Sequence, residues 1–454
     1  MDNKNNIYFV GAGGIGMAAL VRYFLSRGCR VAGYDRTRTD LTDALVSEGA
    51  EIFYDESEKL IPQEYRNPEN TLVVYTPAIP DTHPGLMFFR ENGFEVLKRA
   101  AVLGLITRGS KGICFSGTHG KTTTSSMAAH ILHNSSVGCN AFLGGILRNY
   151  NSNLLLSETS PYTVIEADEY DRSFHQLLPY IAVITSTDPD HLDIYGTEDA
   201  YLESFAHFTE LIRPDGYLLV HEGLKVKPRP QEGVKVYTYS RDSGDFHAVN
   251  IVRGNGTITF DLVTPEGTFT GFELGVPVEI NIENSIAAMA ACYLTGELKP
   301  DDMYYAMRTF MGPKRRFEIA LKSDDGHVVI DDYAHHPDEL KASIASVKAL
   351  WPNKRLTVAF QPHLYSRTRD FAPEFGAALS LADDVILLDI YPAREEPIPG
   401  VSSQLIYDNI TAPNKKLISK DRFVETLREQ GFEVLLTVGA GDIYTFIPEI
   451  CNLV

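Results

Sequence analysis

Short apolar runs alternate with amphipathic stretches along most of this chain, and the two patterns predict different elements. An apolar run rich in β-branched or aromatic residues indicates a buried strand, whereas apolar residues spaced by three or four indicate a helix. Helices are expected at 15–26, 199–212 and 281–294. Strands are expected at 7–10, 30–34, 71–75, 113–115, 162–166, 180–185, 328–330, 356–360, 384–388 and 433–437. Between 246 and 275, β-branched and aromatic residues alternate around glycines, which predicts antiparallel hairpins.

Strands that alternate with helices predict an α/β fold with mainly parallel sheets, whose ligands bind at the carboxyl ends of the strands. New blocks of this pattern start near 111 and after 313, and 454 residues suit about three domains of ~150 residues each. We therefore expect domains at 1–107, 108–313 and 314–454. The first and third are predicted to be Rossmann-like. The second is predicted to be a phosphate-loop α/β domain with added antiparallel strands.

Composition narrows the class of protein. Hydrophobic residues make up 44% of the chain and charged residues 22%, which is an ordinary globular composition. The net charge of −19 argues against a general nucleic-acid or anionic-membrane binder, so anionic ligands need local positive sites. The 5 cysteines are scattered without paired spacing, which fits a reducing cytosol and gives no zinc signature. We find no signal-peptide core and no apolar run that would span a bilayer, so we expect a cytoplasmic protein.

Residues 115–124 read Phe-Ser-Gly-Thr-His-Gly-Lys-Thr-Thr-Thr, between a predicted strand and a predicted helix. A glycine-rich turn aims backbone N–H groups at phosphate oxygens, Lys121 adds a positive charge, and the Thr122 hydroxyl can ligate Mg²⁺. The general phosphate-loop pattern would have glycine at Phe115, and a simple surface turn is the alternative. The stretch predicts binding of a nucleoside triphosphate. The expected contacts are Gly117, Thr118, His119, Gly120, Lys121, Thr122 and Thr123.

A second glycine-rich turn, Gly11-Ala12-Gly13-Gly14-Ile15-Gly16, follows the first predicted strand. It matches G-x-G-x-x-G, and Asp35 follows at about the distance expected of a ribose-binding carboxylate. By itself this turn suggests an NAD-dependent oxidoreductase. However, a pyrophosphate at a helix N-terminus does not reveal which nucleotide carries it, and a UDP-sugar presents the same group. Glycines that merely permit tight strand-to-helix packing are a third alternative.

Two acidic clusters are predicted at successive strand ends beside the phosphate loop. Glu166-Ala167-Asp168-Glu169 follows one strand, and Asp190-His191-Leu192-Asp193 is expected to follow the next. Carboxylate and hydroxyl oxygens suit Mg²⁺, and a histidine nitrogen is a less usual ligand. Either cluster alone fits a solvated loop, but the two together beside Lys121 favour a metal site.

Later blocks contain further candidates. Asn281 and Asn284 share one face of a predicted helix, where they either contact a nucleotide base or ribose or act as ordinary caps. Arg315-Arg316 lies at a predicted domain boundary, and either reaches a phosphate or stays solvated. His363 and Arg367 follow a predicted strand and are candidates for holding an anionic or zwitterionic substrate, with a structural loop as the alternative.

Taken in order, these motifs resemble those of the Mur ligases, which are ATP-dependent amide-bond-forming enzymes of peptidoglycan synthesis. The resemblance spans nearly the whole chain. Its pieces are Gly13–Met17, Gly117–Thr124, Glu166–Glu169, Asp190–Asp193, Arg315–Phe317, Asp332–Pro337, Phe360–His363 and Gly439–Ile443. Within the family, the motifs look most like those of members that join L-alanine to UDP-N-acetylmuramate. The resemblance therefore implies these two substrates, ATP and Mg²⁺.

The resemblance also implies roles for single residues. Lys121, His191 and Arg316 would be catalytic, and the metal would be held by Thr122, Glu166 and His191. Besides the phosphate loop, ATP would contact Asn281, Asn284, Arg316 and Asp332. The first domain would bind the UDP substrate through Gly13, Gly14, Ile15, Gly16, Asp35, Thr76 and Ala78, with His119 near the muramic acid carboxylate. His363 and Arg367 would lie near the alanine.

Three positions depart from the family pattern. Leu364 stands where the family often has Arg, Ile280 occupies a histidine position, and Arg394 replaces a residue that is commonly small. Three other functions stay open at this point: a sister ligase that adds a preformed peptide during cell-wall recycling, an NAD-dependent oxidoreductase, and a non-catalytic nucleotide-binding module. We expect a monomer or weak homodimer that binds neither nucleic acid nor membranes.

Overall fold

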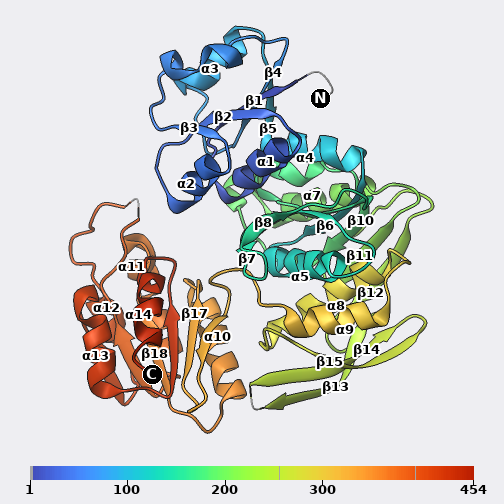
Figure 1. The fold of residues 1–454 in the computed structure, drawn as a ribbon. Coiled ribbons are helices and arrows are strands. Elements are labelled where there is room, and N and C mark those ends of the chain that lie inside the picture. Colours follow the sequence, from blue (N-terminus) through green and yellow to red (C-terminus); the bar gives the residue numbers. More distant parts are fainter. Residues whose placement is uncertain (1–3, 255, 394) are drawn as a thin grey trace. The chain divides into compact units, whose positions relative to one another are not determined.

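The computed structural model describes residues 4–254, 256–393 and 395–454, so the departure at Arg394 lies outside the described residues. Its mixture of helices and largely parallel sheets confirms the predicted α/β fold class (Figure 1). By its internal contacts the chain divides into two compact units. The first comprises the chain up to Val249 with Asp261–Thr270 and Glu283–Met307, and the second comprises Asn250–Phe260, Gly271–Ile282 and Arg308–Val454.

The first sheet has five parallel strands in the order β3-β2-β1-β4-β5. Its elements are β1 (Asn6–Val10), α1 (Ile15–Ser26), β2 (Arg30–Tyr34), α2 (Asp40–Ser47), β3 (Glu51–Phe53), β4 (Thr71–Tyr75), α3 (Pro84–Glu91), β5 (Glu95–Lys98) and α4 (Arg99–Arg108). The chain reverses its direction across the sheet between β1 and β4. The glycine turn after β1 and the segment after β4 therefore lie at a topological switch point, where α/β sheets bind ligands.

The second sheet has seven strands in the order β12-β11-β10-β6-β9-β7-β8, and only β8 pairs antiparallel, with β7. Its elements are β6 (Lys111–Ser116), α5 (Lys121–His133), β7 (Asn140–Leu147), β8 (Ser152–Leu155), β9 (Tyr162–Glu166), β10 (Pro179–Ile184), α6 (Leu192–Tyr195), α7 (Glu198–Glu210), β11 (Tyr217–His221) and β12 (Lys235–Tyr239). The switch point is at β6, between β9 and β10. The phosphate loop follows β6 and so occupies it.

One expectation about this sheet is wrong. Asp190 and His191 were expected directly at a strand end, but β10 already ends at Ile184. The acidic cluster instead lies at the start of the short helix α6. The apolar run that predicted the strand gives way to Ser-Thr-Asp-Pro, which forms a connecting loop.

A three-stranded meander follows, as predicted for 246–275, with the strand order β13-β14-β15. Its strands are β13 (His247–Gly254), β14 (Thr257–Thr264) and β15 (Gly267–Glu273), and the helices α8 (Ile280–Tyr293) and α9 (Pro300–Thr309) come next. The connections of two residues are too short for a parallel crossover, so neighbouring strands are antiparallel. The helix expected at 281–294 is confirmed as α8.

The third sheet has six strands in the order β16-β17-β21-β18-β19-β20, and only β16 pairs antiparallel. Its elements are β16 (Glu318–Lys322), β17 (Val328–Asp332), α10 (Pro337–Leu350), β18 (Leu356–Phe360), α11 (Tyr365–Leu379), β19 (Asp384–Leu387), α12 (Gln404–Tyr407), β20 (Asn414–Leu417), α13 (Phe423–Gln430), β21 (Val434–Val438) and α14 (Ile447–Cys451). The polar segments after β17, β18 and β21 share one sheet edge, because these strands are parallel.

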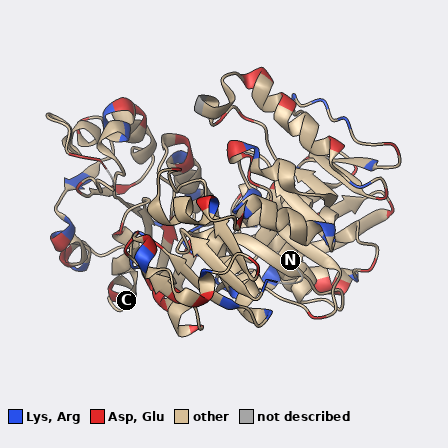
Figure 2. Cartoon of the chain, turned by 90° about the horizontal axis from the view of Figure 1, so that it is seen from above, with Lys and Arg blue, Asp and Glu red and all other residues tan. Residues whose placement is uncertain are grey.

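The inner strands of the three large sheets, such as β1, β6, β9, β18 and β21, are buried apolar runs, as expected of parallel sheets covered on both faces. Figure 2 shows Lys and Arg residues interspersed with Asp and Glu. Among the described residues, no helix combines the length and the apolar character that crossing a bilayer requires.

Candidate functional site

The phosphate loop joins the carboxyl end of β6 to the start of α5 in the middle of the second sheet. Two glycines shape it. Gly117 has φ +133° and Gly120 has φ +82°, which residues with a side chain rarely adopt. A Cβ at Gly117 would also lie 2.2 Å from Thr185 Oγ1. The turn therefore depends on glycine, and it precedes the N–H groups of α5 that lack helical acceptors.

Lys121, the first residue of α5, folds back over this loop. Its Nζ donates to the Gly117 carbonyl at 2.6 Å and lies 2.8 Å from a carboxylate oxygen of Glu169. The Lys121 side chain is 15% exposed and that of Glu169 only 1%. Burial raises the pKa of the Glu169 carboxyl, and the Lys121 ammonium opposes that rise. The ammonium is thus held at the turn, where phosphate oxygens can replace the carbonyl as acceptors.

Thr122 and Glu166 meet beside the same loop. Thr122 Oγ1 donates to Glu166 Oε1 at 3.0 Å, and the Gly144 N–H donates to Oε2 at 3.1 Å. Burial raises the pKa of the Glu166 carboxyl, against the effects of Lys121 and Thr122. A hydroxyl and a carboxylate in this position suit Mg²⁺, which prefers oxygen ligands. The structure therefore brings two of the three predicted metal ligands together.

His191, the third predicted ligand, precedes α6 with φ +53°. Its Nε2 is 3.7 Å from an Asp190 oxygen, and its ring packs edge-on against Tyr170 at a centroid distance of 5.2 Å. Within the described part of the chain, its contacts do not include Thr122 or Glu166. No group of three His, Cys, Asp or Glu side chains there is arranged to hold a metal. The side chain of Asp193 is not described.

The loop residues between the two glycines have separate environments. Thr118 Oγ1 donates to the Asp188 carbonyl at 2.7 Å and lies 2.9 Å from the Tyr201 hydroxyl. The His119 side chain is 70% exposed, with Nε2 3.8 Å from a carboxylate oxygen of Asp188. Thr118 therefore braces the loop, whereas His119 is accessible to a ligand.

The two asparagines of α8 are both buried. Thr124 Oγ1 donates to Asn284 Oδ1 at 3.2 Å, so α8 contacts the helix that follows the phosphate loop. Asn281 Nδ2 donates to the Val276 carbonyl at 3.0 Å. Ile280, which stands where the family pattern has histidine, is 60% exposed. The sequence did not reveal that Glu283, between the asparagines, pairs with His221 at 3.3 Å.

At the first sheet, Asp35 closes the glycine turn. Its Oδ2 accepts the Gly13 N–H at 2.6 Å, so in this structure the predicted ribose-binding carboxylate shapes the turn itself. Gly14 is the N-cap of α1 and is exposed, as a pyrophosphate-binding position requires. Thr76 and Ala78 follow β4 on the same sheet edge, where Thr76 Cγ2 would lie 2.6 Å from a Cβ at Gly11.

The third sheet places two acidic residues at the end of β17. Arg315 Nε donates to Asp331 at 3.2 Å, and its guanidinium also donates to the Gly439 and Gly441 carbonyls. Burial raises the pKa of Asp331 to about 6 despite this arginine. Sequence reasoning had singled out Arg316, which is exposed and lies over the Tyr333 ring at 5.7 Å.

Asp332, the predicted ATP-site aspartate, is buried and accepts hydrogen bonds from the Phe317 N–H and the Ser343 hydroxyl. Burial raises the pKa of its carboxyl. The hydrogen bonds from Ser343 and Phe317 and the Arg316 guanidinium oppose that rise. In this structure Asp332 therefore fixes local backbone and the helix α10.

His363 and Arg367 come together at the start of α11, with Arg367 Nη1 3.4 Å from His363 Nδ1. Burial lowers the pKa of His363, and the arginine lowers it further, so the ring is neutral at pH 7. The His335 ring lies 6.2 Å from the His363 ring, measured between centroids. The Tyr391 ring stacks on the same His363 ring at 5.9 Å. Leu364, which stands where the family often has Arg, has φ +74°, a strained conformation for a residue with a side chain.

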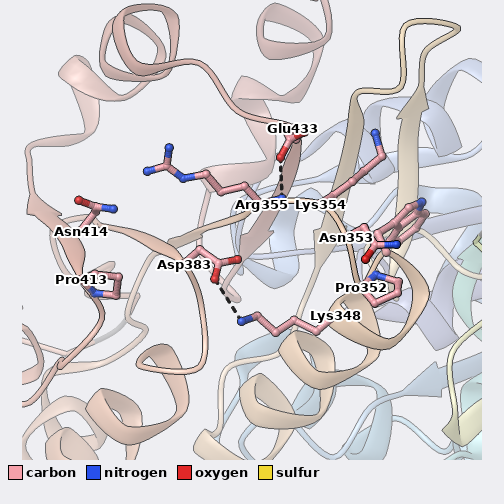
Figure 3. Close-up of a pocket in the computed structure, with 10 residues that line it drawn as sticks. Lys348, Pro352, Asn353, Lys354, Arg355, Asp383, Pro413, Asn414 and Glu433 are labelled. Carbon is pink, nitrogen blue, oxygen red and sulfur yellow. Dashed lines mark hydrogen bonds and ion pairs between the residues drawn. The ribbon is translucent and has the colours of Figure 1, made fainter.

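A hollow of about 580 Å³ lies at the opposite edge of the third sheet from His363 and Arg367 (Figure 3). Arg355, Asp383, Asn414 and Glu433 line it, and each stands at the amino end of a parallel strand. Figure 3 shows Lys348 reaching Asp383 across it. Parallel sheets bind substrates at their carboxyl ends, so this hollow is not the candidate site.

Comparison with known proteins agrees with this geometry. Three family models together match most of the chain: the Mur ligase family catalytic domain at 6–111, the Mur ligase middle domain at 115–292, and the Mur ligase glutamate ligase domain at 315–449. The chain belongs to the Mur ligase family.

The names of individual relatives state their substrates, which the family models do not. The UDP-N-acetylmuramate–L-alanine ligase of Phocaeicola vulgatus is 58% identical over 454 residues, which is 100% of this chain and 99% of the relative. That of Parabacteroides distasonis is 61% identical over 438 residues, 96% of this chain and 94% of the relative. The crystal structure of the UDP-N-acetylmuramate–alanine ligase from Thermotoga maritima has a TM-score of 0.81 at 26% identity and covers 98% of both chains.

Proposed function

We propose that this chain joins L-alanine to the carboxylate of UDP-N-acetylmuramate, using ATP and releasing ADP and phosphate. The observation that carries the proposal is the half-buried Lys121 ammonium, placed at the start of α5 on the sheet's switch point beside Thr122 and Glu166. Full-length relatives with this activity in their names support it. Peptidoglycan precursor synthesis is the corresponding cellular role, in the cytoplasm, by a monomer or weak homodimer.

ATP would lie on the loop 117–123, with its phosphates between Lys121 and the N-terminus of α5. Thr122 and Glu166, with His191 from the neighbouring loop, would hold Mg²⁺, which supplies positive charge at the transferring phosphoryl group. Their oxygens fit that ion because one hydroxyl and one carboxylate already face each other at 3.0 Å. Asn281, Asn284, Arg316 and Asp332 would complete the ATP site.

The chemistry needs a carboxylate to become a better electrophile. One oxygen of the muramate carboxylate bonds to the γ-phosphorus while the bond from that phosphorus to ADP breaks, which gives an acyl phosphate. The neutral amine of alanine then attacks the carbonyl carbon, loses a proton, and phosphate departs as the amide forms. Lys121 and Arg316 would stabilise the charge on the phosphoryl group, because positioning and electrostatics dominate such transfers.

The first and third domains would bring the other substrates. Gly13, Gly14, Ile15, Gly16, Asp35, Thr76 and Ala78 would bind the UDP end, with His119 near the muramate carboxylate. His363 and Arg367 would hold the alanine carboxylate, since a guanidinium suits that group. We propose domain boundaries at 107–108 and 313–314.

An ADP-release assay tests the proposal. Purified protein receives ATP, Mg²⁺ and UDP-N-acetylmuramate with alanine, serine, glycine or a tripeptide in parallel. Alanine should give the highest turnover. Turnover with the tripeptide alone would instead identify a recycling ligase, and no ADP release with any acceptor would reject the proposal.

A further inference from the structure

We propose that Arg99 binds the muramate carboxylate during the reaction, an inference that rests on the proposed function. Arg99 is the first residue of α4 and directly follows β5. A cation at a helix N-terminus meets the positive end of the helix dipole, and the first turn of α4 has no acidic residue to offset this. The position is therefore stabilised by an anion that comes from outside the helix.

Asp168 supplies that anion in this structure. Its Oδ2 lies 3.0 Å from Arg99 Nη2, and the two side chains are 36% and 26% exposed. An ion pair this accessible to water contributes little free energy, so another carboxylate can replace it. Asp168 also accepts the Tyr170 N–H at 3.1 Å, so it keeps a hydrogen-bond partner when Arg99 leaves.

The guanidinium lies against the first turn of α1. A Cβ at Gly16 would be only 2.0 Å from Arg99 Nη1. Glycine at position 16 therefore makes room for this arginine as well as fitting the dinucleotide-type pattern. Arg99 therefore lies beside the first turn of the helix that is proposed to receive the pyrophosphate.

A hollow of about 50 Å³ continues from this point toward the phosphate loop. Gly16, Arg99, Gly144, Glu166 and Asp168 are among the residues that line it. It thus extends from the α1 turn to Glu166, which accepts a hydrogen bond from Thr122 beside the phosphate loop. Its lining thus joins the turn proposed for the pyrophosphate to a carboxylate of the proposed metal site. Of the residues that line it, Arg99 is the cationic one.

The guanidinium has a defined part in the reaction. It can bind both oxygens of a carboxylate through parallel N–H donors, which orients one oxygen toward phosphorus. When the new oxygen–phosphorus bond forms and the bond to ADP breaks, Arg99 acts through its hydrogen bonds and charge and transfers no proton. It then neutralises part of the negative charge of the acyl phosphate.

Calorimetric binding of two sugar nucleotides tests this assignment. UDP-N-acetylmuramate carries the carboxylate, and UDP-N-acetylglucosamine lacks it. Wild-type protein should prefer the muramate form, and Arg99→Met should lose about 10- to 100-fold of that preference with unchanged affinity for UDP-N-acetylglucosamine, as expected for hydrogen bonds to a charged group. Arg99→Lys, which keeps the charge without the paired donors, should retain part of the preference and checks that folding is intact.

A matched control is Arg22→Met. Arg22 lies on α1, pairs with Glu48 at 2.7 Å and donates to Asn153 at 2.8 Å, but does not line the hollow. It should keep the full preference for the muramate form. Asp168→Asn tests whether Arg99 acts only by pairing with Asp168. If loss of that ion pair were the cause of a lower preference, Asp168→Asn would lower the preference as much as Arg99→Met does.

The outcomes are distinct. An Arg99→Met protein that keeps the wild-type preference, or an Asp168→Asn protein that loses it equally, would overturn the role of Arg99 while leaving the proposed function standing. A wild-type protein that binds neither nucleotide would overturn the proposed function, and the role of Arg99 with it.

Discussion

At the scale of single residues, the site is organised by two carboxylates of one short run that face different partners. Glu166 accepts from Thr122, and Glu169, three residues further, pairs with Lys121. The sequence showed an acidic run beside the phosphate loop, but not this division of partners. It depends on the path of the chain after β9, where the following segment Tyr170–Gln176 packs against α4 and α7.

Lys121→Ala should abolish ATP-dependent product formation, with a loss of at least ~10²–10³-fold, because the phosphoryl charge loses its cation. Circular dichroism should show an intact fold. Lys348→Ala is the control, since Lys348 forms an exposed ion pair with Asp383 at the amino edge of the third sheet. Near-normal turnover by the Lys121 variant would discard its role.

Asp331 makes stability depend on pH. Its pKa rises from 3.8 to about 6 in the folded protein. Between these pH values the folded state holds a proton that the unfolded state has lost, so the free energy of unfolding falls as pH rises through this window. The total is roughly 3 kcal/mol at about 1.4 kcal/mol per unit. Thermal melts from pH 4 to 7 should show this decline, and Asp331→Asn should flatten it. An unchanged slope would contradict the assignment.

At the scale of elements, the start of α5 is where backbone shape and function coincide. Gly120 is the N-cap of α5 in a left-handed conformation, and a Cβ there would lie 2.8 Å from Asn284 Oδ1. The glycine therefore sets the helix start and the approach of α8 at once.

Gly120→Ala should lower ATP turnover more than ~10-fold and lower the melting temperature, because it adds backbone strain of order 1–2 kcal/mol and displaces Asn284. Gly28→Ala is the matched control: Gly28 has φ +76° with nothing within 4 Å of a Cβ. It should cost similar stability and leave turnover unchanged. Equal turnover in the two variants would show that the contact with Asn284 does not matter.

At the scale of the whole molecule, the third sheet is a self-contained structure. All six strands come from Glu318–Val438, and a buried cluster including Phe423, Leu435 and Ile450 covers it. Trp351, the single tryptophan of the chain, is 8% exposed and faces Gly256 of the meander.

A fragment of residues 314–454 should therefore fold by itself, with a cooperative thermal transition followed by Trp351 fluorescence. Its emission should be slightly red-shifted relative to the full chain, because the fragment lacks Gly256 beside the indole. A fragment that includes residues 250–282 should not show this shift. A non-cooperative melt of the 314–454 fragment would contradict the proposed boundary at 313–314.

Much of the fold followed from local pattern. Buried strands such as β9 and β18 were predicted with their bounds, because continuous apolar runs ending in polar residues are a strong local signal. The β7–β8 hairpin and the edge strands β12, β16 and β20 were missed. The residues of these three edge strands are partly polar and mostly exposed or half-buried, so their strand character comes from pairing with a neighbour.

The sequence by itself determined the α/β class, the order of the motifs and the phosphate loop, because these depend on residues adjacent in the chain. Tertiary structure decided which charged groups meet: Lys121 with Glu169, Asp331 with Arg315, and Arg99 with Asp168 beside Gly16. Such pairs join residues up to 69 positions apart. Their formation depends on burial and on the three-dimensional path of the backbone, which spacing along a sequence does not specify.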